Sequence, residues 1–382
     1  MSTVTPANSS PPFQLESIQA LRAFAAWLVV LYHLAETPDE RWSIVEGQAN
    51  WLHFYRVIGF SGVDLFFVIS GVVMMVTCYH RFGNAAEVPR FLWRRATRVY
   101  PLYWFTTFAV LTAAWLVPSL AVRDKFVGAN LVKSLVLWPQ QDFPAVAVGW
   151  TLVFEMYFYL VFAALLPFSK KAVRADLLLW GAVTLIFFFH YDQPDFHSLR
   201  GNLSLPIFAS PLTLEFLAGC LIGWYACERK HCLPAVSLWV GAALLLLVGY
   251  FVGNYYPDES QYGLLRVSVY GTAAALVVAG AVGLEQLGRW PRLPGQGLWD
   301  GFAFWGNASY SLYLSHVYVI ALVAKLQSGL SPEMTPATRF AWTLVCLACC
   351  GLVAALGHLL VEQPLLRLFR SRQFTGKTPV AK

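Results

Sequence analysis

The chain has 382 residues, of which 58% are hydrophobic and only 13% are charged. Soluble domains usually carry about 25% charged residues, so the composition excludes an ordinary soluble domain and indicates a polytopic membrane protein. The net charge of +6 does not indicate a nucleic-acid partner, because the basic residues lie in short segments between apolar runs and form no continuous stripe.

The first seventeen residues contain no Lys or Arg, and they contain three prolines. A cleavable signal peptide needs a basic start and a small-residue cleavage site. We therefore expect residues 1–17 to be an N-terminal tail that precedes a retained first span.

Ten apolar stretches follow that are long enough to cross a bilayer, which takes roughly 20 residues. They lie near 18–35, 57–78, 100–118, 147–168, 174–190, 206–226, 234–253, 263–284, 302–326 and 338–361. The sequence shows no internal repeat. It predicts an all-α polytopic membrane protein with one transmembrane domain at 18–366 and a basic tail at 367–382.

The basic residues between these spans predict the orientation, since cytoplasmic loops are enriched in Lys and Arg. One alternating set of connections, with the C-terminal tail, holds seventeen Lys and Arg, and the opposite set holds six. Both termini are therefore expected in the cytoplasm.

Four ionisable side chains are predicted at similar depth inside the membrane: His33, Asp64, Glu155 and His316. A rise of 1.5 Å per residue places them about 8 to 12 Å below the outer face of a hydrocarbon core of about 30 Å. Ionisable groups at this depth are costly and are functional candidates by default.

The stretch RAFAAWLVVLYH places Arg22 and His33 eleven residues apart. Eleven steps of 100° are three turns plus about 20°, so both side chains share one helix face, about 16 Å apart. The two groups can line one polar channel. The alternatives are that Arg22 extends to the cytoplasmic interface and that His33 is a buried histidine with a structural partner.

Other polar groups in the spans have structural alternatives too. Asp64 and Glu155 can serve as partners of Arg22 or of the histidines. Glu215 has no assigned purpose, and His358 is expected to be structural. Seven cysteines are scattered, three of them in the apolar stretch CLACC at 346–350, and no spacing indicates a zinc site or a disulfide framework. No metal cofactor is expected.

A basic cluster precedes the third span, where Arg94, Arg95 and Arg98 lie within one helical turn of one another. Guanidinium groups bind phosphate oxygens in pairs, so the cluster suits a phosphate-bearing ligand. The alternative is an ordinary cytoplasmic anchor for the span.

Seven stretches together resemble the acyltransferase-3 family of integral-membrane acyltransferases, and the first is most similar to its exopolysaccharide-production branch. They are IQALRAFAAWLVVLYH, GFSGVDLFFVISG, RFLWRRATRVYPLYW, WTLVFEMYFYLVF, LEFLAGCLIG, NASYSLYLSH and VEQP. They run in family order along almost the whole chain, from about residue 15 to 370.

The resemblance implies O-acylation of an extracytoplasmic carbohydrate, such as an exopolysaccharide or its lipid-linked precursor, by cytoplasmic acyl-CoA, with acetyl-CoA as the default donor. Under this scheme Arg94, Arg95 and Arg98, with Arg22, bind the phosphates of the donor. Membrane lipids and polysaccharide-biosynthesis proteins are the other expected partners. The resemblance also implies a location in the bacterial cytoplasmic (inner) membrane.

The same scheme makes His33 the general base for the acceptor hydroxyl, oriented by Asp64 or Glu155. His316 holds the oxyanion or the acceptor sugar. Trp150 and Tyr157 stack on sugar rings, although aromatic residues are also common at membrane interfaces. Transfer is either direct or through an acyl-enzyme on His33 or on a hydroxyl such as Ser70.

Two other classes fit the composition. Ten spans with charges near the midplane suit a proton-coupled transporter of a small solute or sugar. A non-catalytic scaffold of a polysaccharide export complex is the second rival.

Overall fold

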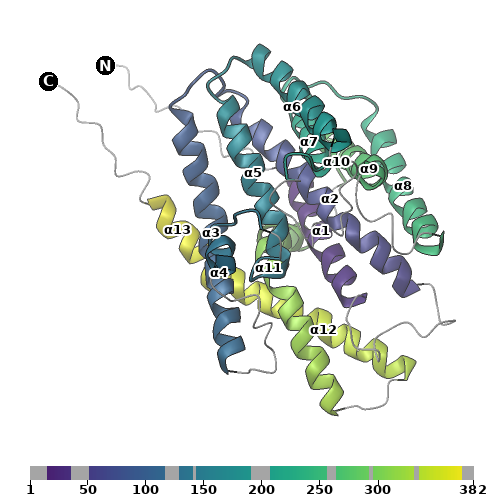
Figure 1. Cartoon of the computed structure of the whole chain (residues 1–382). Helices are drawn as coiled ribbons and strands as arrows, with labels where there is room; N and C mark the ends of the chain where they lie inside the picture. The colour runs from purple at the N-terminus through teal and green to yellow at the C-terminus, as the bar shows by residue number, and fades with distance from the viewer. Residues whose placement is uncertain are drawn as a thin grey trace, which may run out of the picture.

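The computed structural model describes residues 15–35, 51–116, 129–140, 143–190, 207–255, 264–291, 296–330 and 335–371. These residues form helices joined by short turns and contain no strand, which confirms the predicted all-α class. Figure 1 shows the arrangement of the helices.

The helices follow one another as α1 (Glu16–Ala35), α2 (Trp51–Cys78), α3 (Glu87–Leu116), α4 (Ala129–Leu135), the 3-10 turn η3 (Ala147–Gly149), α5 (Trp150–Leu165), α6 (Lys170–His190), α7 (Leu212–Cys227), α8 (Pro234–Tyr255), α9 (Leu264–Arg266), the π-helical turn η5 (Val267–Gly271), α10 (Thr272–Gln286), α11 (Gln296–Leu330), α12 (Pro336–Gly357), the π-helical turn η6 (His358–Glu362) and α13 (Gln363–Ser371).

Eight helical stretches among the described residues are long and apolar enough to cross a bilayer, and α7 and the described apolar part of α8 are shorter. Each of the ten predicted spans overlaps one of these helices. The prediction of a polytopic membrane protein is therefore confirmed.

The third span differs from its prediction, because α3 begins at Glu87 rather than near residue 100. Asn84 Oδ1 accepts a hydrogen bond from the Ala86 amide at 3.0 Å, and Glu87 pairs with Arg90 in the first turn at 2.7 Å. Pro89 is tolerated in a first turn. The basic cluster therefore lies in the first part of a long helix that continues into the third span.

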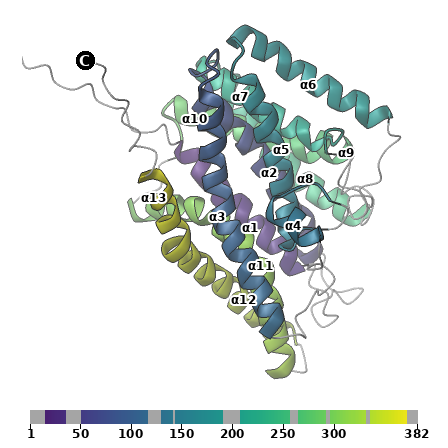
Figure 2. The same cartoon turned by 60° about the vertical axis from the view of Figure 1, so that its left-hand side comes forward.

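The centre of the bundle is formed by α1 and α2, which pack against each other in opposite directions. Figure 1 shows α3 and α5 on one side of this pair and α6 to α10 on the other. Helix α11 runs in the same direction as α1, and α12 packs against α11. Figure 2 shows α12 and α13 lying along α3.

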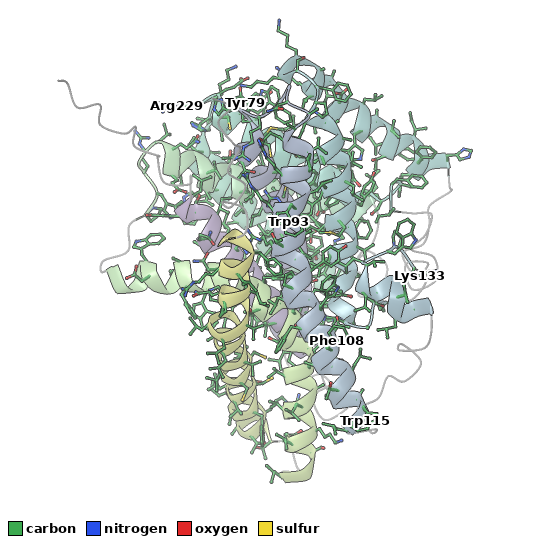
Figure 3. All side chains as sticks on the ribbon, turned by 90° about the vertical axis from the view of Figure 1, so that its left-hand side faces the viewer. Tyr79, Trp93, Phe108, Trp115, Lys133 and Arg229 are labelled. Atoms are coloured by element: carbon green, nitrogen blue, oxygen red, sulfur yellow. The ribbon has the colours of Figure 1, made fainter. Side chains whose placement is uncertain are left out.

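Several outer helices present apolar side chains at the surface. Only 22% of the apolar window of α3 and 28% of that of the α12–α13 segment are buried. Figure 3 shows Trp93, Phe108 and Trp115 along α3, and Trp115 is 80% exposed. Such surfaces suit lipid contact rather than water.

Helices α2 and α7 approach closely because glycines meet at their crossing. A Cβ atom added to Gly71 or Gly219 would collide with the backbone of the facing helix, at Phe216 O and Val68 O respectively. Small residues at helix interfaces allow this approach in membrane proteins. The crossing fixes α2, which carries much of the site described below.

We expect Gly219→Ala to destabilise the folded protein by on the order of 1–3 kcal/mol, because the new methyl group overpacks the crossing. Gly329→Ala is the matched control, since nothing lies within 4 Å of the corresponding Cβ position. Thermal unfolding of both variants in the same detergent is the measurement. Equal melting temperatures for the two variants would contradict the proposed packing role.

Candidate functional site

Helices α1 and α11 contact each other through two polar pairs. Arg22 Nη2 donates to Ser309 Oγ at 3.0 Å, and His33 Nδ1 lies 3.1 Å from His316 Nε2. Both α1 side chains therefore face α11, as their eleven-residue spacing predicted. The two helices run in the same direction and carry a cation at one level and an imidazole pair at another.

The hydrogen bonds of the imidazole pair determine which nitrogen atoms carry protons. His33 Nδ1 lies 3.0 Å from Val29 O, and His316 Nδ1 lies 3.1 Å from Leu312 O. A carbonyl oxygen only accepts, so each Nδ1 carries a hydrogen. The single hydrogen on His33 Nδ1 is then shared between two acceptors, Val29 O and His316 Nε2, and the neutral His33 ring has its lone pair on Nε2. This arrangement leaves His33 Nε2 with the basic lone pair.

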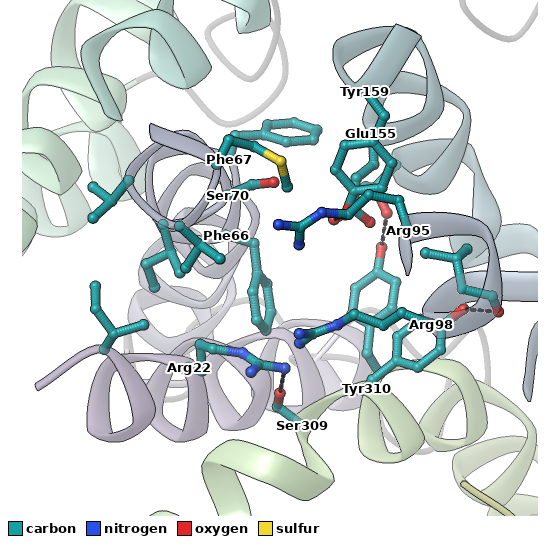
Figure 4. Close-up of a pocket in the computed structure, with 18 of the residues that line it drawn as sticks. Arg22, Phe66, Phe67, Ser70, Arg95, Arg98, Glu155, Tyr159, Ser309 and Tyr310 are labelled. Atoms are coloured by element: carbon teal, nitrogen blue, oxygen red, sulfur yellow. Dashed lines mark hydrogen bonds between the residues drawn. The ribbon is translucent and has the colours of Figure 1, made fainter. Parts of the chain in front are cut away.

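A cavity of about 260 Å³ lies among α1, α2, α3, α5 and α11. Figure 4 shows the guanidinium groups of Arg22, Arg95 and Arg98 directed into this space. The polar residues that line it are Gln19, Arg22, Ser70, Thr77, Arg95, Arg98, Thr151, Glu155, Tyr159, Ser309, Tyr310 and Tyr313. The rest of its wall is aliphatic or aromatic.

The cavity is positively charged, because three arginines face one glutamate. Arg95 donates to Thr77 Oγ1 at 3.3 Å, and its guanidinium lies 5.5 Å from the Tyr159 ring. Glu155 accepts a short hydrogen bond from the Tyr159 hydroxyl and interacts electrostatically with Arg22 and Arg95. The surplus of positive charge suits an anionic ligand.

Three polar atoms of the cavity residues are buried without a hydrogen-bond partner among the described residues: Gln19 Oε1, Ser70 Oγ and Arg95 Nε. An unsatisfied buried polar atom costs about 1–3 kcal/mol, and these three atoms lie on three different helices. A ligand with hydrogen-bonding groups between apolar segments can satisfy them.

The structure thus brings together many of the predicted site residues. Arg22, Ser70, Arg95, Arg98 and Glu155 line one cavity. His33 and His316 contact each other and are not part of the cavity lining.

Asp64 lies elsewhere, on the side of α2 that faces η5. It forms a buried ion pair with Arg266, with Nε to Oδ1 and Nη2 to Oδ2 both at 2.9 Å. The Arg266 guanidinium also lies 3.7 Å from the centre of the Phe60 ring. The predicted orientation of His33 by a carboxylate differs from the structure, because both Asp64 oxygens bind Arg266 and Glu155 lies in the cavity. The neighbour of His33 Nδ1 is His316.

Three further predicted site residues lie outside the cavity lining. Tyr157 OH accepts from Trp180 Nε1 at 3.0 Å, which attaches α5 to α6. Trp150 packs on Phe154, with 6.0 Å between the ring centres. Arg94 is exposed on α3.

Ser309, which accepts a hydrogen bond from Arg22, is a site residue that the sequence did not predict. Ser309 and His316 are seven residues apart, two helical turns, so the spacing within NASYSLYLSH contained this signal. His358, expected to be structural, lies 2.8 Å from Glu362 Oε2, which also accepts from Ser311 Oγ at 2.7 Å. This network attaches η6 to α11.

We expect Arg266→Met alone to destabilise the protein by about 3–5 kcal/mol, because it leaves the buried Asp64 carboxylate without its cation. The double variant Asp64→Asn plus Arg266→Met removes both charges and should recover much of that loss. Denaturation of the wild type, both single variants and the double variant measures the coupling. Simple additivity would contradict the ion pair.

Comparison with known proteins places this geometry in context. The sequence model of the acyltransferase-3 family, described as an acyltransferase domain, matches residues 15–357. This range contains the cavity residues and the imidazole pair, whereas VEQP at 361–364 lies beyond it. No solved structure matches the chain.

Three curated relatives illustrate the range of similarity. The exopolysaccharide production protein ExoZ of Rhizobium meliloti is 32% identical over 85% of this chain and 94% of its own length. The acyltransferase MdmB of Streptomyces mycarofaciens is 26% identical over 96% of this chain and 95% of its own. The putative peptidoglycan O-acetyltransferase YrhL of Bacillus subtilis is 24% identical over 94% of this chain, which covers 57% of that longer protein.

Proposed function

Because the chain belongs to the acyltransferase-3 family, we propose that it transfers an acyl group, most simply acetyl, from acyl-CoA to a hydroxyl of a carbohydrate. The acceptor is an exopolysaccharide or its lipid-linked precursor. The name of ExoZ, the relative that is 32% identical, supports this choice. The donor enters from the cytoplasm, and the acceptor approaches from the opposite side of the inner membrane.

The observation that carries the proposal is the link between a cationic cavity and an imidazole pair through the same two helices. Arg22 and His33 on α1 face Ser309 and His316 on α11. The same two helices therefore carry a cationic group for a phosphate-bearing donor and an imidazole that can accept a proton.

The chemistry of the cavity residues supports acyl-CoA as the donor. Its phosphates suit Arg22, Arg95 and Arg98, of which Arg98 is exposed and marks the mouth of the cavity. Its pantetheine arm alternates amides with apolar segments, which suits the unsatisfied Gln19 and Ser70 atoms between aliphatic walls. The donor's nucleotide remains at the mouth while the arm extends inward.

His33 acts as the general base in this proposal. Its Nε2 takes the proton of the acceptor hydroxyl while the hydroxyl oxygen forms a bond to the thioester carbon. The carbon–sulfur bond then breaks, and the CoA thiolate takes the proton from His33. A positioned base of this kind contributes about 10²–10⁴-fold to the rate. His316 orients the ring by accepting from Nδ1.

The surroundings of Ser70 favour direct transfer over an acyl-enzyme on that residue. Ser70 Oγ has no hydrogen-bond partner among the described residues. A serine nucleophile needs an adjacent base to activate it. The unsatisfied hydroxyl is better suited to donating a hydrogen bond to the arm of the donor.

We expect His33→Ala to lower kcat by at least about 10²-fold, because the general base is lost. His316→Ala should lower kcat with little change in the KM for acetyl-CoA, since it acts through His33. The assay uses protein in proteoliposomes, radiolabelled acetyl-CoA and lipid-linked oligosaccharides extracted from host membranes, and counts labelled ester. If His33→Ala turned over at close to the wild-type rate, His33 would not be the general base.

The double variant Arg95→Ala plus Arg98→Ala should raise the KM for acetyl-CoA on the order of tenfold or more, since charge-assisted hydrogen bonds contribute roughly twice as much as neutral ones. Arg94→Ala is the matched comparison, because it makes an equal charge change per residue on an exposed side chain outside the cavity. It should change the KM for acetyl-CoA less. Equal KM values for the double variant and for Arg94→Ala would indicate that the cluster is only a cytoplasmic anchor for the span and does not bind the donor.

The same proteoliposomes distinguish an enzyme from a carrier. Labelled ester together with free CoA supports acyl transfer. Accumulation of intact labelled solute inside the vesicles, without ester, would support the transporter alternative instead.

A further inference from the structure

One side of the cavity wall is entirely aliphatic. Its residues lie at the beginning of α1 and on the second half of α2, and they pack together in one hydrophobic cluster of the described core. They are Leu15, Ile18, Ile69, Val72, Val73 and Val76. The apolar residues Phe67, Met74 and Leu152, which line the cavity elsewhere, belong to a different cluster. We call the first set the aliphatic wall.

The aliphatic wall adjoins the arginines of the cavity. Thr77 Oγ1 donates to Val73 O at 2.6 Å and accepts from Arg95 Nη2 at 3.3 Å. On α1, Arg22 follows Ile18 by four residues, so the two side chains share one helix face. A ligand on the aliphatic wall therefore lies directly beside the groups that suit phosphate.

The aliphatic wall extends from the protein surface into the interior. Leu15, Val73 and Val76 are partly exposed, whereas Ile18 and Val72 are buried. Because removal of apolar area from water is favourable, a flat and largely apolar group that enters from the surface can be bound here.

Glu285 fixes the start of α1 and with it the position of the aliphatic wall. Its Oε1 accepts from the Glu16 amide at 2.7 Å, and its Oε2 accepts from the Ser17 amide at 2.9 Å. The N-terminus of a helix otherwise attracts anions such as phosphate. Because a carboxylate already binds these amides, the cavity arginines are the partners for the phosphates of a ligand at this place.

The distance to the imidazole pair determines which part of a donor the aliphatic wall can bind. Ile18 precedes His33 by fifteen residues on α1, which corresponds to about 22 Å. A thioester that reacts beside His33 therefore cannot have its acyl group at this wall. In acyl-CoA the thioester is at one end and the adenine is at the other, with the phosphates next to the adenosine. The end with the phosphates and the adenine matches the arginines and the aliphatic wall.

We propose that the aliphatic wall is the binding subsite for the adenine ring of the donor, with the cavity arginines binding the adjacent phosphates. The proposal rests on the proposed function for the identity of the donor. One face of the ring packs on the wall, and the polar edge of the ring stays in contact with water at the partly exposed end. The subsite favours CoA thioesters over thioesters of phosphopantetheine or of carrier proteins, which lack adenine.

The first test compares acetyl-CoA with S-acetyl-4′-phosphopantetheine, which has the same arm and thioester but no adenosine. In proteoliposomes, Val73→Trp should raise the KM for acetyl-CoA on the order of tenfold more than the KM for the shorter donor, because the indole occupies the space of the adenine. Val236→Trp is the matched control, since Val236 is exposed on α8 and outside the cavity lining. An equal rise in KM for both donors in Val73→Trp would overturn the subsite.

The second test needs no acyl transfer, so it separates failure of the subsite from failure of the proposed function. Purified full-length Val73→Cys is labelled in detergent with N-ethylmaleimide, and mass spectrometry distinguishes the introduced thiol from the native cysteines. Adenosine 3′,5′-bisphosphate, at about ten times its Kd, should slow this labelling on the order of tenfold by mass action. Pyrophosphate, which offers phosphates without adenine, should slow it much less.

His80→Cys is the matched control for labelling, because His80 is exposed beyond the end of α2 and outside the cavity lining. Neither ligand should change its labelling rate. Equal protection of Val73→Cys by both ligands, or no protection by the bisphosphate, would overturn the subsite. If the bisphosphate protects as expected but wild type makes no ester from acetyl-CoA, the adenine subsite stands and the proposed function is wrong. Gel filtration and circular dichroism of each variant confirm that it folds.

Discussion

The packing of α1 against α11 is the contact on which the rest of the site depends. Within a membrane, a guanidinium and an imidazole are costly unless they face other protein groups. Because the two helices run in the same direction, each polar group of α1 meets a polar group of α11 at the same level. The pairing makes both groups tolerable and places them on the inner face of the bundle.

Helix α2 divides the interior into two parts with different roles. One face carries Phe66, Phe67 and Ser70 into the cavity. Another carries Asp64 to Arg266, beside the π-helical turn that follows α9. The ion pair is buried and doubly hydrogen-bonded, so its charges neutralise each other away from the cationic cavity. The cavity thereby keeps its surplus of positive charge for a ligand.

Aromatic residues define the limits of the polar space. Arg95 lies against the Tyr159 ring, and Phe66 packs edge-to-face on Tyr313 within the cavity wall. Rings offer large apolar surfaces with few rotatable bonds, so they can hold a cation at one place and exclude water at another. The proposed chemistry needs the first of these, since a charged donor must be bound.

The sequence by itself determined the membrane class, the approximate spans, the shared face of Arg22 and His33, and the family resemblance, because hydropathy and helical periodicity are local properties of the chain. It also drew attention to His316 and the arginine cluster. Only the tertiary structure decided the partners. It assigned Asp64 to Arg266, placed Glu155 among the arginines, set His316 against His33 and left Arg94 outside the cavity. The depth of a residue along a helix follows from its residue number. Which neighbour its side chain contacts depends on how helices distant in the sequence cross. Glycines such as Gly71 and Gly219 determine those crossings.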